Sequence, residues 1–202
     1  LTVSGLACRR GERVLFEGLD FAVVPGEITL LRGPNGAGKT TLLLCLAGLM
    51  RPTAGSITFS GRDPEQRPDS DIGFLGHLSA VKTRLTLTEN LRFWAAVNDV
   101  SPALIEPALE AVGLAPLAGL DAGHLSAGQT RRLALARLIL SDRPIWLLDE
   151  PTAALDADGD ILVAGLIDIH LDRGGMAVAA THYDLALKNP ARVKTLPIGR
   201  RP

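Results

Sequence analysis

The sequence predicts an α/β fold with a mainly parallel β-sheet at its core, and three observations favour it. Continuous apolar runs at 28–31, 145–148 and 176–181 are typical of strands that are buried on both faces. Helical patterns follow the first two runs, and strands that alternate with helices indicate a parallel sheet. The composition is 47% hydrophobic but only 4% aromatic, which suits a core of Leu, Val, Ile and Ala.

The first 32 residues are predicted to form short strands joined by turns. Apolar and alternating segments indicate strands at 1–3, 14–16, 19–23 and 28–31, with turns at 9–12 and 25–27. Alternation in Leu19-Asp20-Phe21 favours a strand with one exposed face.

A glycine-rich stretch joins the strand at 28–31 to a helix at 42–47. It reads Gly33-Pro34-Asn35-Gly36-Ala37-Gly38-Lys39-Thr40-Thr41, the pattern G-x-x-x-x-G-K-[ST]. Strand, loop and helix in this order are the context of a phosphate-binding loop, whose backbone N–H groups converge on the anion. Lys39 would reach the β- and γ-phosphates, and the Thr40 hydroxyl would hold Mg²⁺. A plain glycine turn with a solvated lysine is the alternative, and the two flanks disfavour it.

Gly48 and Pro52 are expected to end the first helix. A short strand at 55–61 follows, then a charged, proline-containing loop at 62–71 and another strand at 72–75 that ends at Gly76-His77.

The middle of the chain is predicted to be helical. Thr86 and Glu89 fit a capping box that opens a helix of roughly ten residues. A second helix begins at Ser101-Pro102, is kinked or restarted at Pro107 and ends at Gly113. Ser126 to Gln129 resembles a further capping box, and on the helix beyond it Arg131, Arg132 and Arg137 are expected to face solvent or an anion.

The last third of the chain returns to strand, helix and strand. The strand at 145–148 ends in Asp149-Glu150, a helix runs over 157–173, and the strand at 176–181 ends at His182. Ligands of such sheets bind at the carboxyl ends of the strands, so these polar residues are expected beside the phosphate loop.

The polar residues at these strand ends suit nucleotide hydrolysis. Asp149 suits a direct or indirect role at Mg²⁺, and Glu150 suits a general base that polarises the attacking water. His182 could bond the γ-phosphate and that water. The alternative for each of these residues is a solvated side chain at a strand end. His124 and His170 are expected to be solvated.

Composition and charge exclude several other classes of protein. The net charge of −1 gives no reason to expect a nucleic-acid partner. Cys8 and Cys45 do not make a disulfide framework, so a reduced chain is expected, with Cys45 as a small core residue. No apolar run approaches the roughly 20 residues that a membrane span needs.

The motifs together resemble those of the ATP-binding-cassette (ABC) ATPases. Leu125-Ser126-Ala127-Gly128-Gln129 is similar to the signature motif of that family, with Ala127 where glycine is usual. The stretch 33–40 resembles Walker A, 145–150 Walker B and Ala154-Leu155-Asp156 the D-loop, while His182 resembles the switch histidine. The order and spacing also match, over nearly the whole chain.

This resemblance implies a P-loop NTPase fold over residues 1–202, with an N-terminal antiparallel β part and a helical subdomain at about 86–140. It also implies ATP and Mg²⁺ as cofactors, bound in a head-to-tail sandwich of two copies. The phosphate loop of one copy would then face the signature residues 125–129 of the other, with Asp156 nearby. A second anion site at the capped helix start fits this arrangement, because one chain needs only one phosphate cradle.

Two departures from the family pattern concern the nucleotide. His77 occupies the place of the Q-loop glutamine, and it either contacts Mg²⁺ or water or has no role in the site. The aromatic residue that usually stacks on adenine is missing, and Arg10 falls closest to its place. A guanidinium can stack on a base, so adenine binding need not be lost.

Several strings resemble the ATP-binding subunit of the haem exporter used in cytochrome c biogenesis. They lie at 74–77, 89–94, 125–137 and 144–151. This implies a peripheral subunit on the cytoplasmic face of a bacterial inner membrane, bound to integral membrane subunits near 77–91. Phe93 and Trp94 belong either to that contact or to the core. The remaining alternatives are the ATPase of another ABC transporter and a non-transport ABC protein.

Overall fold

The computed structural model describes residues 1–60 and 71–199, and the predicted loop at 62–71 lies almost wholly outside them. Two sheets and five α-helices make up the described part. The strands are β1 (Thr2–Arg10), β2 (Arg13–Ala22), β3 (Ile28–Arg32), β4 (Ala54–Thr58), β5 (Ile72–Leu75), β6 (Ile145–Asp149), β7 (Met176–Ala180) and β8 (Val193–Pro197). The α-helices are α1 (Lys39–Leu46), α2 (Leu87–Val97), α3 (Ile105–Ala111), α4 (Ala127–Leu140) and α5 (Ala157–Asp172).

The larger sheet is parallel throughout and has the order β5-β6-β7-β3-β8. All five residues of β6 are buried, as expected for a central strand covered on both faces. The α/β class and the mainly parallel core are therefore confirmed. The edge strand β8 was not predicted, because only its first and fourth residues are half-buried and the other three are exposed, which gives a weak apolar signal.

The smaller sheet has the order β2-β1-β4 and is antiparallel, as predicted for the N-terminal part. The short strands expected at 1–3, 14–16 and 19–23 are parts of one long hairpin, β1 and β2, that turns at residues 11–12. Register shifts interrupt the pairing of β1 with β2, which explains why the sequence signal is broken into pieces.

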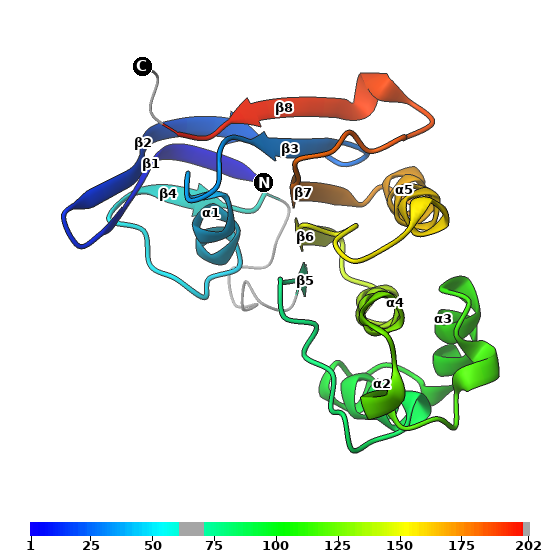
Figure 1. The fold of residues 1–202 in the computed structure, drawn as a ribbon. Coiled ribbons are helices and arrows are strands. Elements are labelled where there is room, and N and C mark those ends of the chain that lie inside the picture. Colours follow the sequence, from blue (N-terminus) through cyan, green and yellow to red (C-terminus); the bar gives the residue numbers. More distant parts are fainter. Residues whose placement is uncertain (61–70, 200–202) are drawn as a thin grey trace.

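The helices cover the two faces of the parallel sheet unequally. Helix α1 lies between the two sheets, whereas α4 and α5 cover the opposite face and α2 and α3 lie beyond α4 (Figure 1). Alternation along β6 supports this, because Leu147 packs with α1 and the small sheet while Trp146 and Leu148 pack with the other helices. Cys45 is buried on α1, as predicted.

The helix boundaries of the middle region follow the predicted caps. Thr86 accepts from the Glu89 N–H in a complete capping box, and Ser126 does the same with Gln129. Ser101 caps a short 3₁₀-helix at Pro102–Leu104, and α3 restarts directly after it, with Pro107 in the first turn where its missing N–H costs no helical bond. Within the described ranges, no helix has both the length and the apolar run needed to cross a membrane.

Candidate functional site

The glycine-rich loop connects the carboxyl end of β3 to the first turn of α1. Gly38 is the N-cap of α1, with φ +104° and no side-chain cap, so the first N–H groups of the helix remain available to an anion. A Cβ on Gly33 would lie 2.1 Å from the Ile198 carbonyl oxygen, so this position has room only for glycine. The loop therefore has the backbone form of a phosphate cradle.

Lys39, the first residue of α1, is directed back over this loop. Its side chain is largely buried, with 7% of the residue exposed. The Nζ atom donates to the carbonyl oxygens of Gly33 at 2.7 Å and Pro34 at 3.2 Å, and it lies 3.3 Å from Nε2 of His182. The ammonium group is thus held at the mouth of the cradle.

Thr40 and Asp149 meet at the same edge of the sheet. The Thr40 hydroxyl donates to the Asp149 carboxylate, at 3.0 Å from Oδ2 and 3.2 Å from Oδ1, and Asp149 is buried. A hydroxyl beside a carboxylate supplies the oxygen ligands that Mg²⁺ prefers, usually together with substrate phosphates and water. Among the described residues, no group of three or more His, Cys, Asp or Glu is arranged to hold a metal ion by itself.

Glu150 directly follows β6 and has an unusual backbone. Its φ is +47°, a left-handed conformation that costs a non-glycine residue about 1–2 kcal/mol. The Glu150 N–H donates to the Ala180 carbonyl at 2.8 Å, and its Oε1 lies 3.5 Å from His182 Nε2. This turn directs the carboxylate toward His182 and the phosphate loop.

His182 connects the cation and the carboxylate of the site. The same Nε2 atom faces Lys39 Nζ and Glu150 Oε1. With Nε2 unprotonated the ring accepts from Lys39, and with Nε2 protonated it donates toward Glu150. The tautomer of the ring therefore decides which of these two hydrogen bonds forms.

A cavity of about 880 Å³ joins these groups to the hairpin of β1 and β2. One end is lined by the phosphate loop, Asp149, Glu150, His77 and His182. The other end is lined by Cys8, Arg9, Arg10, Arg13, Leu15, Leu44 and Met50, with no aromatic side chain. A phosphate end and a base end in one cavity of this size suit a nucleotide.

Arg13 is a site residue that the sequence analysis missed. Its Nη2 donates to the Gly36 carbonyl at 3.2 Å, so it contacts the phosphate loop directly, whereas Arg10 only lines the cavity. The hairpin turn brings both arginines to the base end of the cavity. No local sequence pattern could predict the contact between Arg13 and Gly36, because the two residues are 23 positions apart.

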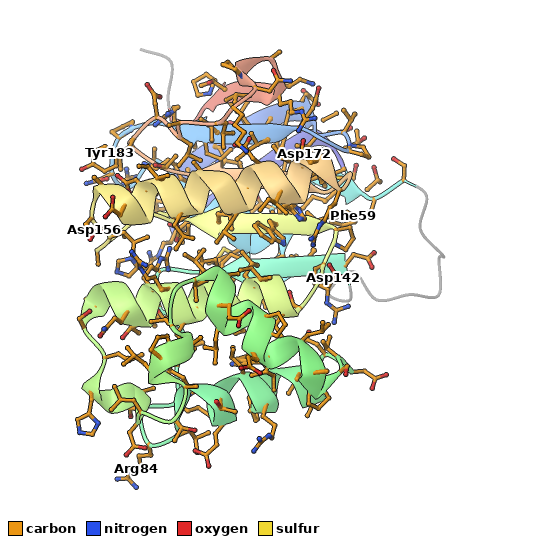
Figure 2. All side chains as sticks on the ribbon, turned by 90° about the vertical axis from the view of Figure 1, so that its right-hand side faces the viewer. Phe59, Arg84, Asp142, Asp156, Asp172 and Tyr183 are labelled. Atoms are coloured by element: carbon orange, nitrogen blue, oxygen red, sulfur yellow. The ribbon has the colours of Figure 1, made fainter. Side chains whose placement is uncertain are left out.

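The signature residues and Asp156 do not line this cavity. Ser126 and Gln129 cap the exposed start of α4, and Asp156 caps α5 by accepting from the Gly159 N–H at 2.9 Å. Figure 2 shows Asp156 and Tyr183 at one end of the molecule and Asp142 and Asp172 at the other. The signature therefore offers a second helix N-terminus that is separate from the phosphate cradle.

Within the signature, the two small residues have different surroundings. Ala127 is exposed, so a methyl group in place of hydrogen meets no obstacle there. A Cβ on Gly128 would lie 3.0 Å from the Ala154 carbonyl, which makes glycine the suitable residue at this position. The departure from the family pattern therefore falls at residue 127, where a larger side chain can be accommodated.

Two expectations about arginines are wrong. Arg131 is 4% exposed and donates to four backbone carbonyls, and Arg137 donates to the Phe74 carbonyl at 3.1 Å with its guanidinium 4.8 Å from the centre of the Trp94 ring. Burial lowers the pKa of both. Arg131 is buried and Arg137 is half-buried, because α4 packs near the ends of β5 and β6, where backbone carbonyls accept from both side chains.

The expectation that His170 is solvated is also wrong, whereas His124 is exposed as predicted. The His170 ring stacks on Trp146 with 4.0 Å between centroids, and Nε2 lies 3.2 Å from the Met176 carbonyl. Burial lowers the pKa of His170, which favours the neutral ring. Of the two aromatics left open, Phe93 is 41% exposed and Trp94 is half-buried.

Comparison with protein families and curated proteins gives a consistent result. The ABC transporter family profile matches residues 16–153. The cytochrome c biogenesis ATP-binding export protein CcmA of Rhizobium etli is 47% identical over 200 residues, which cover 96% of this chain and 93% of that protein. The protein of the same name from Rhizobium meliloti is 51% identical over 191 residues and 92% of both chains.

Solved structures agree on the fold. An ABC transporter ATP-binding protein from Pyrococcus furiosus superposes with a TM-score of 0.82 at 24% identity, covering 98% of this chain and 96% of that one. A dimeric ATP-binding cassette in a post-hydrolysis state with ADP and Pi gives a TM-score of 0.80 at 22% identity, with the same coverage. At these identities the two structures support the architecture alone.

Proposed function

This chain belongs to the ABC transporter family, and on that premise we propose that it is the ATP-hydrolysing subunit of the exporter that serves c-type cytochrome biogenesis. The observation that carries the proposal is that five polar residues lie together at the carboxyl edge of the parallel sheet. They are Lys39, Thr40, Asp149, Glu150 and His182. Similarity to CcmA proteins over nearly the full length supports the assignment to this exporter. Haem as its cargo is the part of the proposal that the family resemblance of the sequence implies. Residues 1–202 then form one ABC ATPase domain, with a helical subdomain at about 86–140.

The residues of the site take distinct roles in ATP hydrolysis. The loop N–H groups from Gly33 to Thr41 and Lys39 bind the phosphates. Glu150 accepts a proton from the attacking water, and His182 holds the γ-phosphate and that water in line. His77 lines the same cavity and replaces the glutamine of the family pattern.

Thr40 and Asp149 would hold Mg²⁺, since their oxygens already face each other and fit that ion. The ion would neutralise charge on the β- and γ-phosphate oxygens. Within the protein, Asp149 also keeps the Thr40 hydroxyl oriented toward the phosphate cradle.

A second copy of the chain completes the site. Ser126 to Gln129 lie outside the cavity of their own chain, yet they present a capped helix N-terminus suited to an anion. We therefore assign the signature and Asp156 to the ATP of the partner in a head-to-tail dimer. The dimeric cassette among the solved structures is in keeping with this arrangement.

Arg10 lines the base end of the cavity and is expected to contact adenine. Arg10→Ala is expected to weaken ATP binding by roughly 2- to 30-fold, the range of a cation–π contact of about 0.5–2 kcal/mol. Arg10→Tyr should retain or tighten binding, because an aromatic ring can also stack on the base. Fluorescent-nucleotide titration measures both, with the exposed Arg92→Ala as a control. Equal affinity in all variants would show that Arg10 does not hold the base.

Exposed apolar and aromatic side chains in the segment that follows His77 are the proposed contact with the membrane subunits. Leu78 is 83% exposed and Phe93 41%, and Lys82 Nζ lies 4.3 Å from the centre of the Phe93 ring. Aromatic side chains such as Phe93 are enriched at protein–protein interfaces. The chain would thus lie on the cytoplasmic face of a bacterial inner membrane, held by its integral partners.

Co-purification tests this partner assignment. The tagged chain, isolated from detergent-solubilised host membranes, should bring down integral membrane proteins, and Leu78→Asp should reduce their yield at least severalfold. Val24→Asp changes a residue that is 48% exposed and remote from His77 in sequence, and it should leave the yield unchanged. Recovery of ribosomal or DNA-repair proteins instead of membrane proteins would favour a non-transport ABC protein.

A further inference from the structure

Arg131 of α4 makes an unusual set of contacts for a buried side chain. Its Nε donates to the Pro151 carbonyl at 3.2 Å and its Nη1 to the Gly76 carbonyl at 2.7 Å. Its Nη2 donates to the carbonyls of Asp149 and Glu150, both at 2.6 Å. The flat, rigid fork of a guanidinium is suited to joining several acceptors in one plane.

These carbonyls belong to the segments that form the hydrolytic end of the cavity. Asp149 is the last residue of β6, Glu150 and Pro151 follow it, and Gly76 directly precedes His77 after β5. Burial lowers the pKa of Arg131, and the Asp149 carboxylate opposes this effect. A buried cation costs less when every contact is a good hydrogen bond, and the four carbonyls supply those bonds.

The contact with Glu150 has a direct consequence for its side chain. The Glu150 backbone is held on both sides: its N–H donates to the Ala180 carbonyl, and its carbonyl accepts from Arg131 and from the Ala153 N–H at 3.0 Å. This fixes the left-handed backbone at φ +47° and the direction of the carboxylate toward His182. Without Arg131 the segment 149–151 would lose three hydrogen bonds to its carbonyls, one at each residue.

Arg131 also belongs to the helix that begins at the signature. It lies five residues after Ser126 on α4, which is one continuous helix from Ala127 to Leu140. A displacement of α4, or of the segment that leads into His77, therefore pulls on the carbonyls of Asp149 and Glu150. One side chain thus joins the signature helix, the His77 segment and Glu150.

We propose that Arg131 is a positioning residue that sets the orientation of Glu150 and couples it to the signature helix and to the His77 segment. This rests on the proposed role of Glu150 as general base. If Arg131 only stabilised the fold, its substitution would lower the free energy of unfolding without a specific effect on kcat. Arg137 offers the comparison, because it is a half-buried arginine of the same helix and bonds a strand carbonyl, that of Phe74. It makes none of the hydrogen bonds to Asp149, Glu150 and Pro151 that Arg131 makes.

Steady-state kinetics of the full-length chain separate these roles. Arg131→Gln should lower kcat by about 10²-fold, since misplacing a catalytic group by about 1 Å can cost this much. The dissociation constant for ATP should change by less than about threefold, because Arg131 bonds no part of the phosphate loop. Arg137→Gln should lower the melting temperature but keep kcat within about threefold.

A double variant gives the decisive comparison. Added to Glu150→Gln, Arg131→Gln should lower kcat by no more than about twofold, because the group that it orients is already disabled. Arg131→Lys keeps the charge but not the fork, and it should show the same split between kcat and ATP affinity if the Gln variant fails to fold. Unchanged kcat in a folded Arg131 variant, or a full additional loss in the double variant, overturns the proposal. Normal turnover of Glu150→Gln alone would instead overturn the assigned role of Glu150.

Discussion

Glu150→Gln is expected to lower the ATP turnover of the chain by about 10²–10⁴-fold, the contribution of a positioned general base. The amide keeps the size of the side chain and the backbone turn at φ +47° but has no basic oxygen for the proton of the attacking water. ATP affinity should remain, since the phosphates are held by the loop and Lys39. Phosphate release and equilibrium nucleotide binding measure the two quantities.

The same variant should accumulate as an ATP-bound dimer, visible by size-exclusion chromatography with light scattering. Glu110→Gln is the control, because it removes an exposed carboxylate from α3, away from the cavity. Turnover of Glu150→Gln within about threefold of the unmodified chain would rule out this residue as the base.

Ser126→Arg is expected to abolish turnover while ATP binding to the single chain is almost unchanged. Ser126 lies outside the nucleotide cavity of its own chain, so a bulky cation there should block only the approach of a second copy and its ATP. In the unmodified chain, specific activity should rise with protein concentration, as expected when two copies form each site.

The change at Ser126 also removes a helix cap, which is worth about 1 kcal/mol. Ser101→Arg controls for this, because Ser101 caps the 3₁₀-helix at Pro102–Leu104 through the Ala103 N–H and is likewise exposed. It should leave turnover unchanged. Activity that does not depend on concentration and survives Ser126→Arg would indicate a self-contained site.

The parallel core and the residues at its carboxyl edge could be predicted because their signals are local. A buried parallel strand that is followed by a glycine-rich loop or by Asp149-Glu150 places polar groups at the carboxyl edge of the sheet, independently of the rest of the sequence. The caps at Thr86 and Ser126 were predictable for the same reason, since each motif spans only four residues.

The contacts of the arginines could not be predicted, because they depend on which backbone carbonyls tertiary packing leaves unpaired. Arg131 reaches Gly76 across 55 residues, and Arg13 reaches Gly36 across 23. Neither the charge nor the helical spacing distinguishes such residues from a solvated face. His170 was misjudged for a related reason, since its burial follows from stacking on Trp146 of another element.

ATP hydrolysis at this site is expected to drive the assembly of c-type cytochromes, and removing the lysine of the phosphate loop tests this in the cell. A bacterial host whose only copy carries Lys39→Ala should lose covalently haem-bound c-type cytochromes while b-type cytochromes persist, as seen by haem staining and difference spectra. Lys39 Nζ lies at the mouth of the phosphate cradle, so its removal disables ATP use there. The exposed Lys188→Ala, at matched protein level, should support normal amounts. Normal c-type cytochromes in the Lys39→Ala strain would contradict the assignment and leave the chain as the ATPase of a different ABC transporter.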